Sequence, residues 1–363
     1  AANEELTATQ LFTNRGMAIM MPLISTLMSG LTLAIYWIGA YLINGAGLMD
    51  RLTLFSNMVV FSAYAMQVIM SFMMLVMIFV LWPRASVSAK RINEVLETEP
   101  SIIDGTKSEG MEGAIGEIEF KNVSFRYPGA ADDVLTGISF TAKRGESVAF
   151  IGSTGSGKST LINLVPRFYD ASEGEVLVDG VNVKQYTQEA LHNKIGYVPQ
   201  KAVTFRGTVA SNIRFGDNGK APATDDEVET AMRIAQGADF VEQMEGRYDA
   251  EIAQAGSNLS GGQKQRLAIA RAVARKPEIY IFDDSFSALD YKTDRTLRTA
   301  LKRETAGVTS LIVAQRIGTI LDADQIIVLN EGQIVGRGTH KQLLQTCEVY
   351  KEIAMSQLSE EEL

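Results

Sequence analysis

The sequence predicts an α-helical transmembrane hairpin followed by a larger α/β domain, and three observations support this fold class. Residues 16–49 and 52–83 contain no Asp, Glu, Lys, Arg or His. A short apolar run at 147–151 leads into a glycine-rich loop and a helical pattern. A second apolar run, residues 279–282, is followed directly by two aspartates, Asp283 and Asp284. Short apolar strands that alternate with helical segments are typical of an α/β domain.

Composition limits the possible functions before any motif is considered. Both parts of the chain are rich in apolar residues, which excludes a disordered protein. The formal net charge is −9, and residues 1–95 hold five basic and four acidic side chains, so the negative charge lies in the rest. An acidic domain repels phosphate backbones, which argues against nucleic acid as a partner. The single cysteine, Cys347, excludes an intrachain disulfide.

Residues 1–98 are predicted to be the membrane part, with helices at about 17–43 and 54–82 and cytosolic extensions. A helix needs roughly 20 apolar residues to cross a bilayer, and both uncharged stretches are longer. Between them, Asn44-Gly45-Ala46-Gly47 is typical of a turn. The alternative, buried core helices of a soluble protein, fits such lengths poorly.

The positions of basic residues predict which way the hairpin faces. One basic residue precedes the first span and three follow the second, namely Arg15, Arg84, Lys90 and Arg91. The loop between the spans has one basic and one acidic residue. An excess of Lys and Arg marks the cytoplasmic side, so both ends of the hairpin are expected in the cytoplasm.

Methionine is concentrated in the membrane part. Eleven of the 15 methionines lie in residues 1–95. Met side chains repack easily around different neighbours. They therefore fit either packing against lipid and other helices, or a surface that accepts a small hydrophobic substrate.

After the second span, a polar helix is expected at 85–97 as the cytosolic extension of the membrane part, followed by a linker at 99–116 and one nucleotide-binding domain at 117–363. The linker is rich in Pro, Gly, Ser and Asp. Residues 118–125 alternate in polarity and are predicted to be the first strand of the domain.

The glycine loop is the strongest chemical motif. Residues 152–159 read G-S-T-G-S-G-K-S between a strand and a helix. Glycines allow backbone N–H groups to surround phosphate oxygens, and a helix N-terminus adds partial positive charge. Lys158 is expected to reach the β- and γ-phosphates of ATP, and Ser159 to ligate Mg²⁺. The nucleotide-binding residues predicted here are Gly152, Ser153, Thr154, Gly155, Ser156, Gly157, Lys158, Ser159 and Thr160.

Two further motifs accompany the loop. Asp283 ends the strand 279–282, where a carboxylate beside a phosphate loop holds Mg²⁺. The alternative, an N-cap for the next helix, explains one aspartate better than two. Leu259-Ser260-Gly261-Gly262-Gln263 predicts a second helix start that binds an anion, although the same pattern also suits a plain helix cap.

Together these motifs resemble the ATP-binding cassette (ABC) transporters of the exporter type, along essentially the whole chain. Residues 152–159 resemble the Walker A loop of that family, 259–263 the signature motif, 279–283 Walker B and 287–290 the D-loop. The resemblance implies a P-loop NTPase (ABC ATPase) domain. It also implies two such domains that sandwich each ATP between the Walker A loop of one subunit and the signature motif of the other.

The resemblance also implies roles for residues outside these motifs. Tyr127 is similar to the aromatic residue that stacks on adenine, and Gln200 to the Q-loop glutamine that contacts Mg²⁺ and communicates with the membrane helices. Ser260, Gly261, Gly262 and Gln263 are expected to bind the ATP held by a partner subunit.

The chain departs from the family pattern at two catalytic positions. Asp284 stands where the family usually has the glutamate that orients or deprotonates water. Its side chain is one methylene shorter, and a misplacement of about 1 Å can cost about 100-fold in rate. Gln315 stands where the family usually has histidine. Glutamine can donate a hydrogen bond to a phosphate, but unlike histidine it cannot be protonated to a cation.

Both departures affect the same ATP site, whereas the signature motif is intact. We therefore expect a degenerate site in an asymmetric heterodimer, in which this chain completes the competent site of a second half-transporter. A slow homodimeric exporter and a membrane-anchored regulatory ATPase remain as alternatives. The expected cargo is a small hydrophobic molecule, and the expected location is a bacterial plasma (inner) membrane, with the ATPase domain in the cytoplasm.

The membrane part holds two of the six or so helices of a family half. We therefore expect the sequence to be truncated at its N-terminus.

Overall fold

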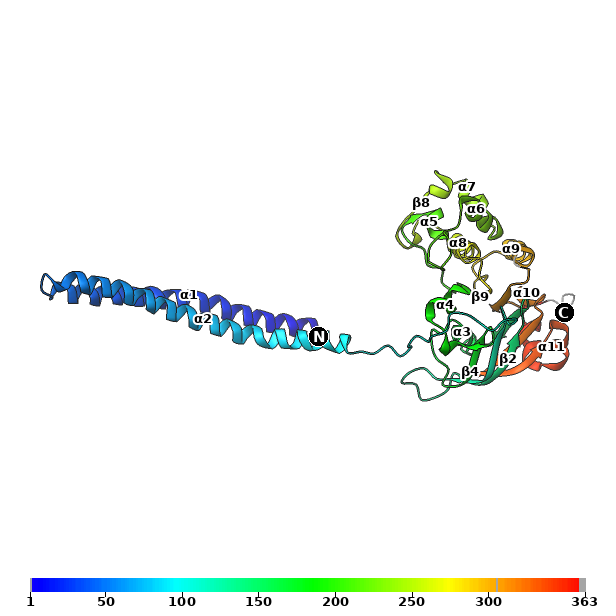
Figure 1. Cartoon of the computed structure of the whole chain (residues 1–363), viewed down its shortest axis with the longest axis horizontal. Coiled ribbons are helices and arrows are strands. Elements are labelled where there is room, and N and C mark those ends of the chain that lie inside the picture. Colours follow the sequence, from blue (N-terminus) through cyan, green and yellow to red (C-terminus); the bar gives the residue numbers. More distant parts are fainter. Residues whose placement is uncertain (1, 305, 359–363) are drawn as a thin grey trace. The chain divides into compact units, whose positions relative to one another are not determined.

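The computed structural model describes residues 2–304 and 306–358. Contacts between Cα atoms divide the chain into two compact units, Ala1–Pro100 and Ser101–Leu363. The first is a hairpin of two helices and the second is an α/β unit with mixed sheets (Figure 1). The predicted fold class is confirmed.

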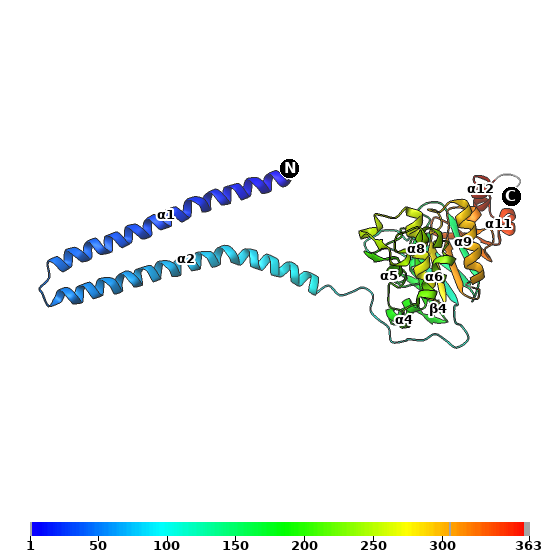
Figure 2. The same ribbon diagram turned by 90° about the horizontal axis from the view of Figure 1, so that it is seen from above.

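The first unit consists of α1 (Ala2–Asn44) and α2 (Asp50–Leu96), which run side by side (Figure 2). Both are long and apolar enough to cross a membrane. The predicted turn is confirmed, because no helix covers residues 45–49. At its end, Asp50 N–H donates to the Gly47 carbonyl. Both helices extend beyond the predicted spans, since the polar flanks at 2–16 and 83–96 continue them.

The hairpin helices approach each other closely at Gly39 and expose large side chains elsewhere. A Cβ atom on Gly39 would lie 2.2 Å from Met58 Sδ, so glycine permits this approach. Elsewhere the aromatic side chains of Trp37, Phe61 and Phe79 are 77%, 63% and 71% exposed. These helices are therefore not the buried core of a soluble domain, and an apolar surface of this extent needs lipid or protein to cover it.

The second unit contains three sheets. The largest has the order β12-β11-β3-β10-β9-β6, with five parallel strands and β12 antiparallel at one edge. A four-stranded antiparallel sheet has the order β2-β1-β4-β5, and β7 pairs with β8. The strands are β1 (Ile118–Phe125), β2 (Leu135–Ala142), β3 (Ser147–Gly152), β4 (Glu173–Val178), β5 (Val181–Asn182), β6 (Ile195–Val198), β7 (Gly207–Thr208), β8 (Glu251–Ile252), β9 (Ile279–Asp283), β10 (Thr309–Val313), β11 (Gln325–Asn330) and β12 (Gln333–Gly338).

Helices cover these sheets and enclose three apolar cores. One core lies between the two larger sheets, one beneath α6 and α8, and one beneath α11 and α12. The helices are α3 (Lys158–Asn163), α4 (Gln188–Asn193), α5 (Val209–Ile213), α6 (Asp225–Ile234), α7 (Ala238–Glu242), α8 (Gly261–Ala274), α9 (Tyr291–Glu304), α10 (Ile317–Ile320), α11 (His340–Thr346) and α12 (Glu348–Met355), with 3₁₀ turns at Val183–Gln185, Arg247–Asp249 and Gln254–Gly256.

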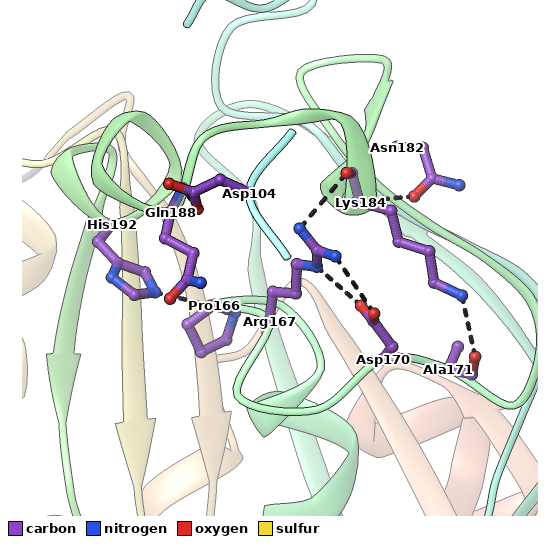
Figure 3. A network of polar contacts seen from close by, with 9 residues as sticks. All are labelled: Asp104, Pro166, Arg167, Asp170, Ala171, Asn182, Lys184, Gln188 and His192. Atoms are coloured by element: carbon purple, nitrogen blue, oxygen red, sulfur yellow. Dashed lines mark hydrogen bonds and ion pairs between the residues drawn. The ribbon is translucent and has the colours of Figure 1, made fainter. Parts of the chain in front are cut away.

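Residues 101–116, which we term the connector, belong to the second unit and pack on the rest of it. Gly105 N–H donates to the Tyr186 carbonyl at 2.9 Å, and Gly116 N–H donates to Asp179 Oδ1 at 2.7 Å. Gly105 must be glycine here, because a Cβ atom would lie 2.1 Å from the Gln185 carbonyl oxygen. Asp104 Oδ1 accepts from Gln188 N–H in the first turn of α4 (Figure 3).

The loop before β4 is also fixed by polar contacts. Arg167, which is buried, donates through Nε to Asp170 Oδ1 at 2.8 Å and through Nη1 to the Lys184 carbonyl (Figure 3). His192 Nε2 lies 2.8 Å from the Pro166 carbonyl oxygen. The connector and this loop therefore lie against the same α4 segment.

Candidate functional site

The parallel sheet brings the predicted catalytic residues together at one edge. Within the sheet, Val313 pairs with Asp283 and with Phe150, and Val198 pairs with Phe282, so the carboxyl ends of β3, β6, β9 and β10 coincide. The residues that follow these ends are the glycine loop, Gln200, Asp284 and Gln315. Ligands of open α/β sheets bind outside this edge.

The glycine loop turns sharply between β3 and α3. Gly152, Gly155 and Gly157 have φ values of 153°, 84° and 94°, in the region that favours glycine. A Cβ atom on Gly152 would lie 2.0 Å from the Leu329 carbonyl oxygen, whereas one on Gly155 would meet nothing within 4 Å. The loop therefore packs tightly on β11 at its base and is open at its tip.

The ammonium group of Lys158 is hydrogen-bonded to oxygen atoms of this loop. Its Nζ donates to the carbonyl oxygens of Gly152 at 2.9 Å and Ser153 at 2.7 Å, and to Ser156 Oγ at 3.2 Å. Burial lowers the pKa of the Lys158 ammonium group, while the nearby carboxylates of Asp284 and Asp283 oppose this shift. A cation held by loop carbonyls is available to a phosphate that enters the loop.

Ser159 and Asp283 form a pair of oxygen donors suited to a hard cation. Ser159 Oγ donates to Asp283 Oδ1 at 2.7 Å. Burial raises the pKa of the Asp283 carboxyl group, and the Ser159 hydrogen bond partly offsets that rise. Hydroxyl and carboxylate oxygens are the ligands that Mg²⁺ takes together with substrate phosphates. The donor set therefore fits Mg²⁺ bound with a nucleotide.

Asp284 lies between the two glutamines that the sequence singled out. Gln315 Nε2 donates to Asp284 Oδ2 at 2.6 Å, and Gln200 Nε2 donates to the same oxygen at 3.3 Å. The backbone of Asp284 has φ = 46°, a conformation that side chains other than glycine adopt at a cost. Burial raises the pKa of the Asp284 carboxyl group. One carboxylate oxygen is thus already engaged by two amides.

Tyr127 belongs to an aromatic cluster beside the glycine loop. Its ring meets Phe125 edge-on at 4.8 Å and Tyr169 edge-on at 5.2 Å between ring centroids. Its hydroxyl lies 3.0 Å from Thr160 Oγ1, on α3. Tyr169 was not identified from the sequence, since no local motif signals a partner 42 positions from Tyr127.

A second residue missed in the sequence reaches the predicted metal site. Tyr197 on β6 donates its hydroxyl hydrogen to Asn163 Oδ1 at 3.0 Å, at the end of α3. Burial raises the pKa of the Tyr197 hydroxyl group, and the Asp283 carboxylate raises it further. Tyr197 pairs with Ile281 in the sheet, and no local sequence motif signals this position.

The signature-like segment forms a helix start of its own. Ser260 Oγ accepts from Gln263 N–H at 3.3 Å, and Gln263 Oε1 accepts from Ser260 N–H at 2.8 Å, a complete capping box at the start of α8. Within residues 2–304 and 306–358, no hydrogen bond joins residues 260–263 to the glycine loop or to Asp283. The structure therefore does not bring this segment into the chain's own site.

Comparison with known proteins identifies similar chains. A family model described as ABC transporter matches residues 135–287. An uncharacterised ABC transporter ATP-binding protein of Mycobacterium tuberculosis is 42% identical over 357 residues, which cover 98% of this chain and 60% of that protein. The ATP-dependent lipid A-core flippase of Pseudomonas fluorescens is 44% identical over 256 residues, covering 70% of this chain and 42% of the flippase.

A solved structure matches across both units. The structure of a bacterial Atm1-family ABC exporter with ATP bound gives a TM-score of 0.77 at 32% identity and covers 93% of this chain and 57% of that chain. This chain spans about 60% of the length of the mycobacterial relative and 57% of the chain in the solved structure.

Proposed function

We propose, from the ABC ATPase domain that the chain contains, that it is the ATP-binding and membrane subunit of an exporter-type half-transporter. The similarity to the Atm1-family exporter supports this proposal, because it extends over the helical hairpin as well as the ATPase domain. The helices α1 and α2 then lie in the bilayer of a bacterial inner membrane, and the ATPase domain lies in the cytoplasm.

In the proposed nucleotide site, this chain binds ATP with Mg²⁺. The backbone of residues 152–160 surrounds the phosphates, and Lys158 leaves the loop carbonyls to contact the β- and γ-phosphates. Ser159, Asp283 and Gln200 would hold Mg²⁺, and the bound ion would supply positive charge beside the phosphates. Tyr127 stacks on the adenine.

The proposed site holds ATP but hydrolyses it slowly. The observation that carries this proposal is the short contact of 2.6 Å between Gln315 Nε2 and Asp284 Oδ2. Asp284 is shorter than the usual glutamate, and this amide already engages one of its oxygens. A water molecule in line with the γ-phosphate then lacks a well-placed base.

The proposed partner is a second half-transporter that retains glutamate and histidine at these two positions. The capping box at Ser260–Gln263 supports this arrangement, because it leaves an intact helix N-terminus outside the chain's own site. The exported molecule is proposed to be small and hydrophobic. The exposed side chains of Met70, Met74 and Met77 on α2 are consistent with an adaptable apolar surface.

An ATPase assay on the purified chain, alone and with its partner half-transporter, tests this proposal. We expect the chain alone to bind MgATP and release phosphate slowly, and the pair to turn over rapidly. Lys158→Ala provides the control, because it removes the phosphate contact and is expected to abolish binding. Rapid phosphate release by the isolated wild-type chain, absent from Lys158→Ala, would refute the degenerate site.

A further inference from the structure

Gln357, just beyond α12, contacts the backbone that carries Gln315. Gln357 Oε1 accepts from Ile317 N–H at 2.8 Å, and Gln357 Nε2 donates to the Gln315 carbonyl at 2.9 Å. One side-chain amide thus makes two reciprocal hydrogen bonds to the segment 315–317, which we term the switch segment. Gln315 and Ile317 lie 42 and 40 positions before Gln357 in the sequence.

The switch segment needs such a partner because of its own sequence. Ile317 is the first residue of α10, and its N–H group is one of those that have no partner inside the helix. Arg316 occupies the N-cap position and makes no side-chain cap hydrogen bond. An arginine side chain has no acceptor atom. Gln357 therefore supplies from the C-terminal segment the acceptor that the local N-cap lacks.

The helix that precedes Gln357 is firmly packed. Tyr350 and Ala354 in α12 are fully buried, in the same core as Ile151 of β3 and Ile317 of α10. The Tyr350 hydroxyl lies 2.8 Å from His340 Nδ1, which ties α12 to α11. Gln357 is thus presented to the switch segment from a rigid support rather than from a free tail.

From these contacts we propose that Gln357 is a positioning residue for Gln315. It fixes the backbone on both sides of Arg316, so that the Gln315 amide is held at Asp284 and next to the position of the γ-phosphate. This inference rests on the proposed function, in which Gln315 faces the γ-phosphate of ATP. It adds that the C-terminal segment determines how well the degenerate site distinguishes ATP from ADP.

The test compares the affinities of the full chain in detergent for the fluorescent analogues MANT-ATP and MANT-ADP with Mg²⁺. Gln315 is proposed to meet only the γ-phosphate, so a positioning role changes ATP affinity and leaves ADP affinity unchanged. We expect Gln357→Met, which keeps the side-chain length but removes both hydrogen bonds, to lower the preference for ATP over ADP about fivefold. Gln357→Asn, whose amide is one methylene short, is expected to give the same loss.

Two further variants separate this inference from its premise. Gln315→Ala is expected to lower the ATP preference at least as much, and Gln357→Met added to it to cause no further loss, because the two residues act together. Gln342→Met is the matched control, since Gln342 Oε1 similarly accepts from Thr339 N–H at the start of α11. It is expected to leave the preference unchanged.

The outcomes are distinct. If Gln315→Ala lowers the ATP preference and Gln357→Met does not, the positioning role is wrong and the proposed site stands. If Gln315→Ala also leaves the preference unchanged, the proposed γ-phosphate contact fails, and the inference fails with it. A parallel drop in MANT-ADP affinity for Gln357→Met would point to general disruption of the domain and would contradict the inference.

Discussion

At the scale of single residues, the account depends on two substitutions that act through one contact. Asp284 is short, and Gln315 donates to its Oδ2 at 2.6 Å. A longer acid at position 284 would still meet the same amide. Repair of one residue therefore leaves the other defect in place, and the two changes are expected to be strongly coupled.

In the proposed degenerate site, faster hydrolysis requires changes at both positions. We expect Asp284→Glu alone to raise hydrolysis at this site by less than about threefold, and Asp284→Glu with Gln315→His to raise it by about 100-fold, the scale of rate lost when a catalytic group is misplaced. Single-turnover phosphate release from the assembled pair measures this. Asp217→Glu, the same chemical change on an exposed loop remote from the motifs, is the control. Full recovery from Asp284→Glu alone would show that Gln315 does not limit the site.

Residue identities were predictable where a local motif carries the chemistry. Lys158, Ser159 and Asp283 were identified from short patterns, and the structure brings them together at the carboxyl edge of the sheet. Tyr169 and Gln357 were not identifiable, because each meets its partner through tertiary packing of segments about 40 positions apart. No periodicity or local spacing reports such a contact.

At the scale of elements, α8 depends on how it begins. Its capping box satisfies two N–H groups at the helix start, and Ser260 supplies the acceptor for one of them. In the proposed dimer the same helix start faces the partner's ATP. Under this proposal, Ser260 contributes both to the local stability of the helix and to catalysis at the partner's site.

Ser260→Ala separates these two roles. We expect it to lower the free energy of unfolding by about 1 kcal/mol and to reduce phosphate release from the partner's site by at least tenfold, while ATP binding by this chain is unchanged. Thr224→Ala removes the equivalent capping box at α6 and is the matched control. It is expected to cost similar stability without slowing hydrolysis. Equal loss of hydrolysis in both variants would reduce the effect of Ser260 to stability alone.

The contact between α11 and α12 is expected to depend on pH. Burial lowers the pKa of His340, whose Nδ1 faces the Tyr350 hydroxyl. A base with a depressed pKa in the folded state binds protons more tightly when unfolded, so its contribution to stability is lost as pH falls below about 6.5. Hydrogen exchange of α12 amides, corrected for intrinsic rates, should show reduced protection at pH 5.5 relative to 7.5. His340→Gln should remove this difference, and its persistence would exclude His340 as the cause.

The positions of the elements that carry the motifs were readable from the sequence. Strands β1, β3 and β9 and the start of α3 lie where alternation, apolar runs and the glycine loop predicted them. The antiparallel sheet order and the packing of the connector on the ATPase domain were not readable. Both depend on long-range backbone hydrogen bonds, such as that from Gly105 N–H to the Tyr186 carbonyl, which leave no local pattern.

At the scale of the whole molecule, the chain combines an apolar helical hairpin with an ABC ATPase domain. The hairpin exposes a surface that needs lipid or other helices, and the ATPase domain has a helix start at Ser260 that we propose serves a partner's site. The hairpin surface is exposed, and the helix start, although its own capping box is complete, lies outside the chain's own nucleotide site. They are the physical basis for proposing that it works in a membrane, next to a second half-transporter.

The nucleotide held by this chain during turnover tests the central claim most directly. The assembled exporter would be supplied with photoreactive 8-azido-[α-³²P]ATP and Mg²⁺, irradiated during steady-state turnover, and the label on each subunit identified as di- or triphosphate. The account predicts triphosphate on this chain while the partner accumulates diphosphate. Diphosphate on both subunits, formed at equal rates, would contradict it.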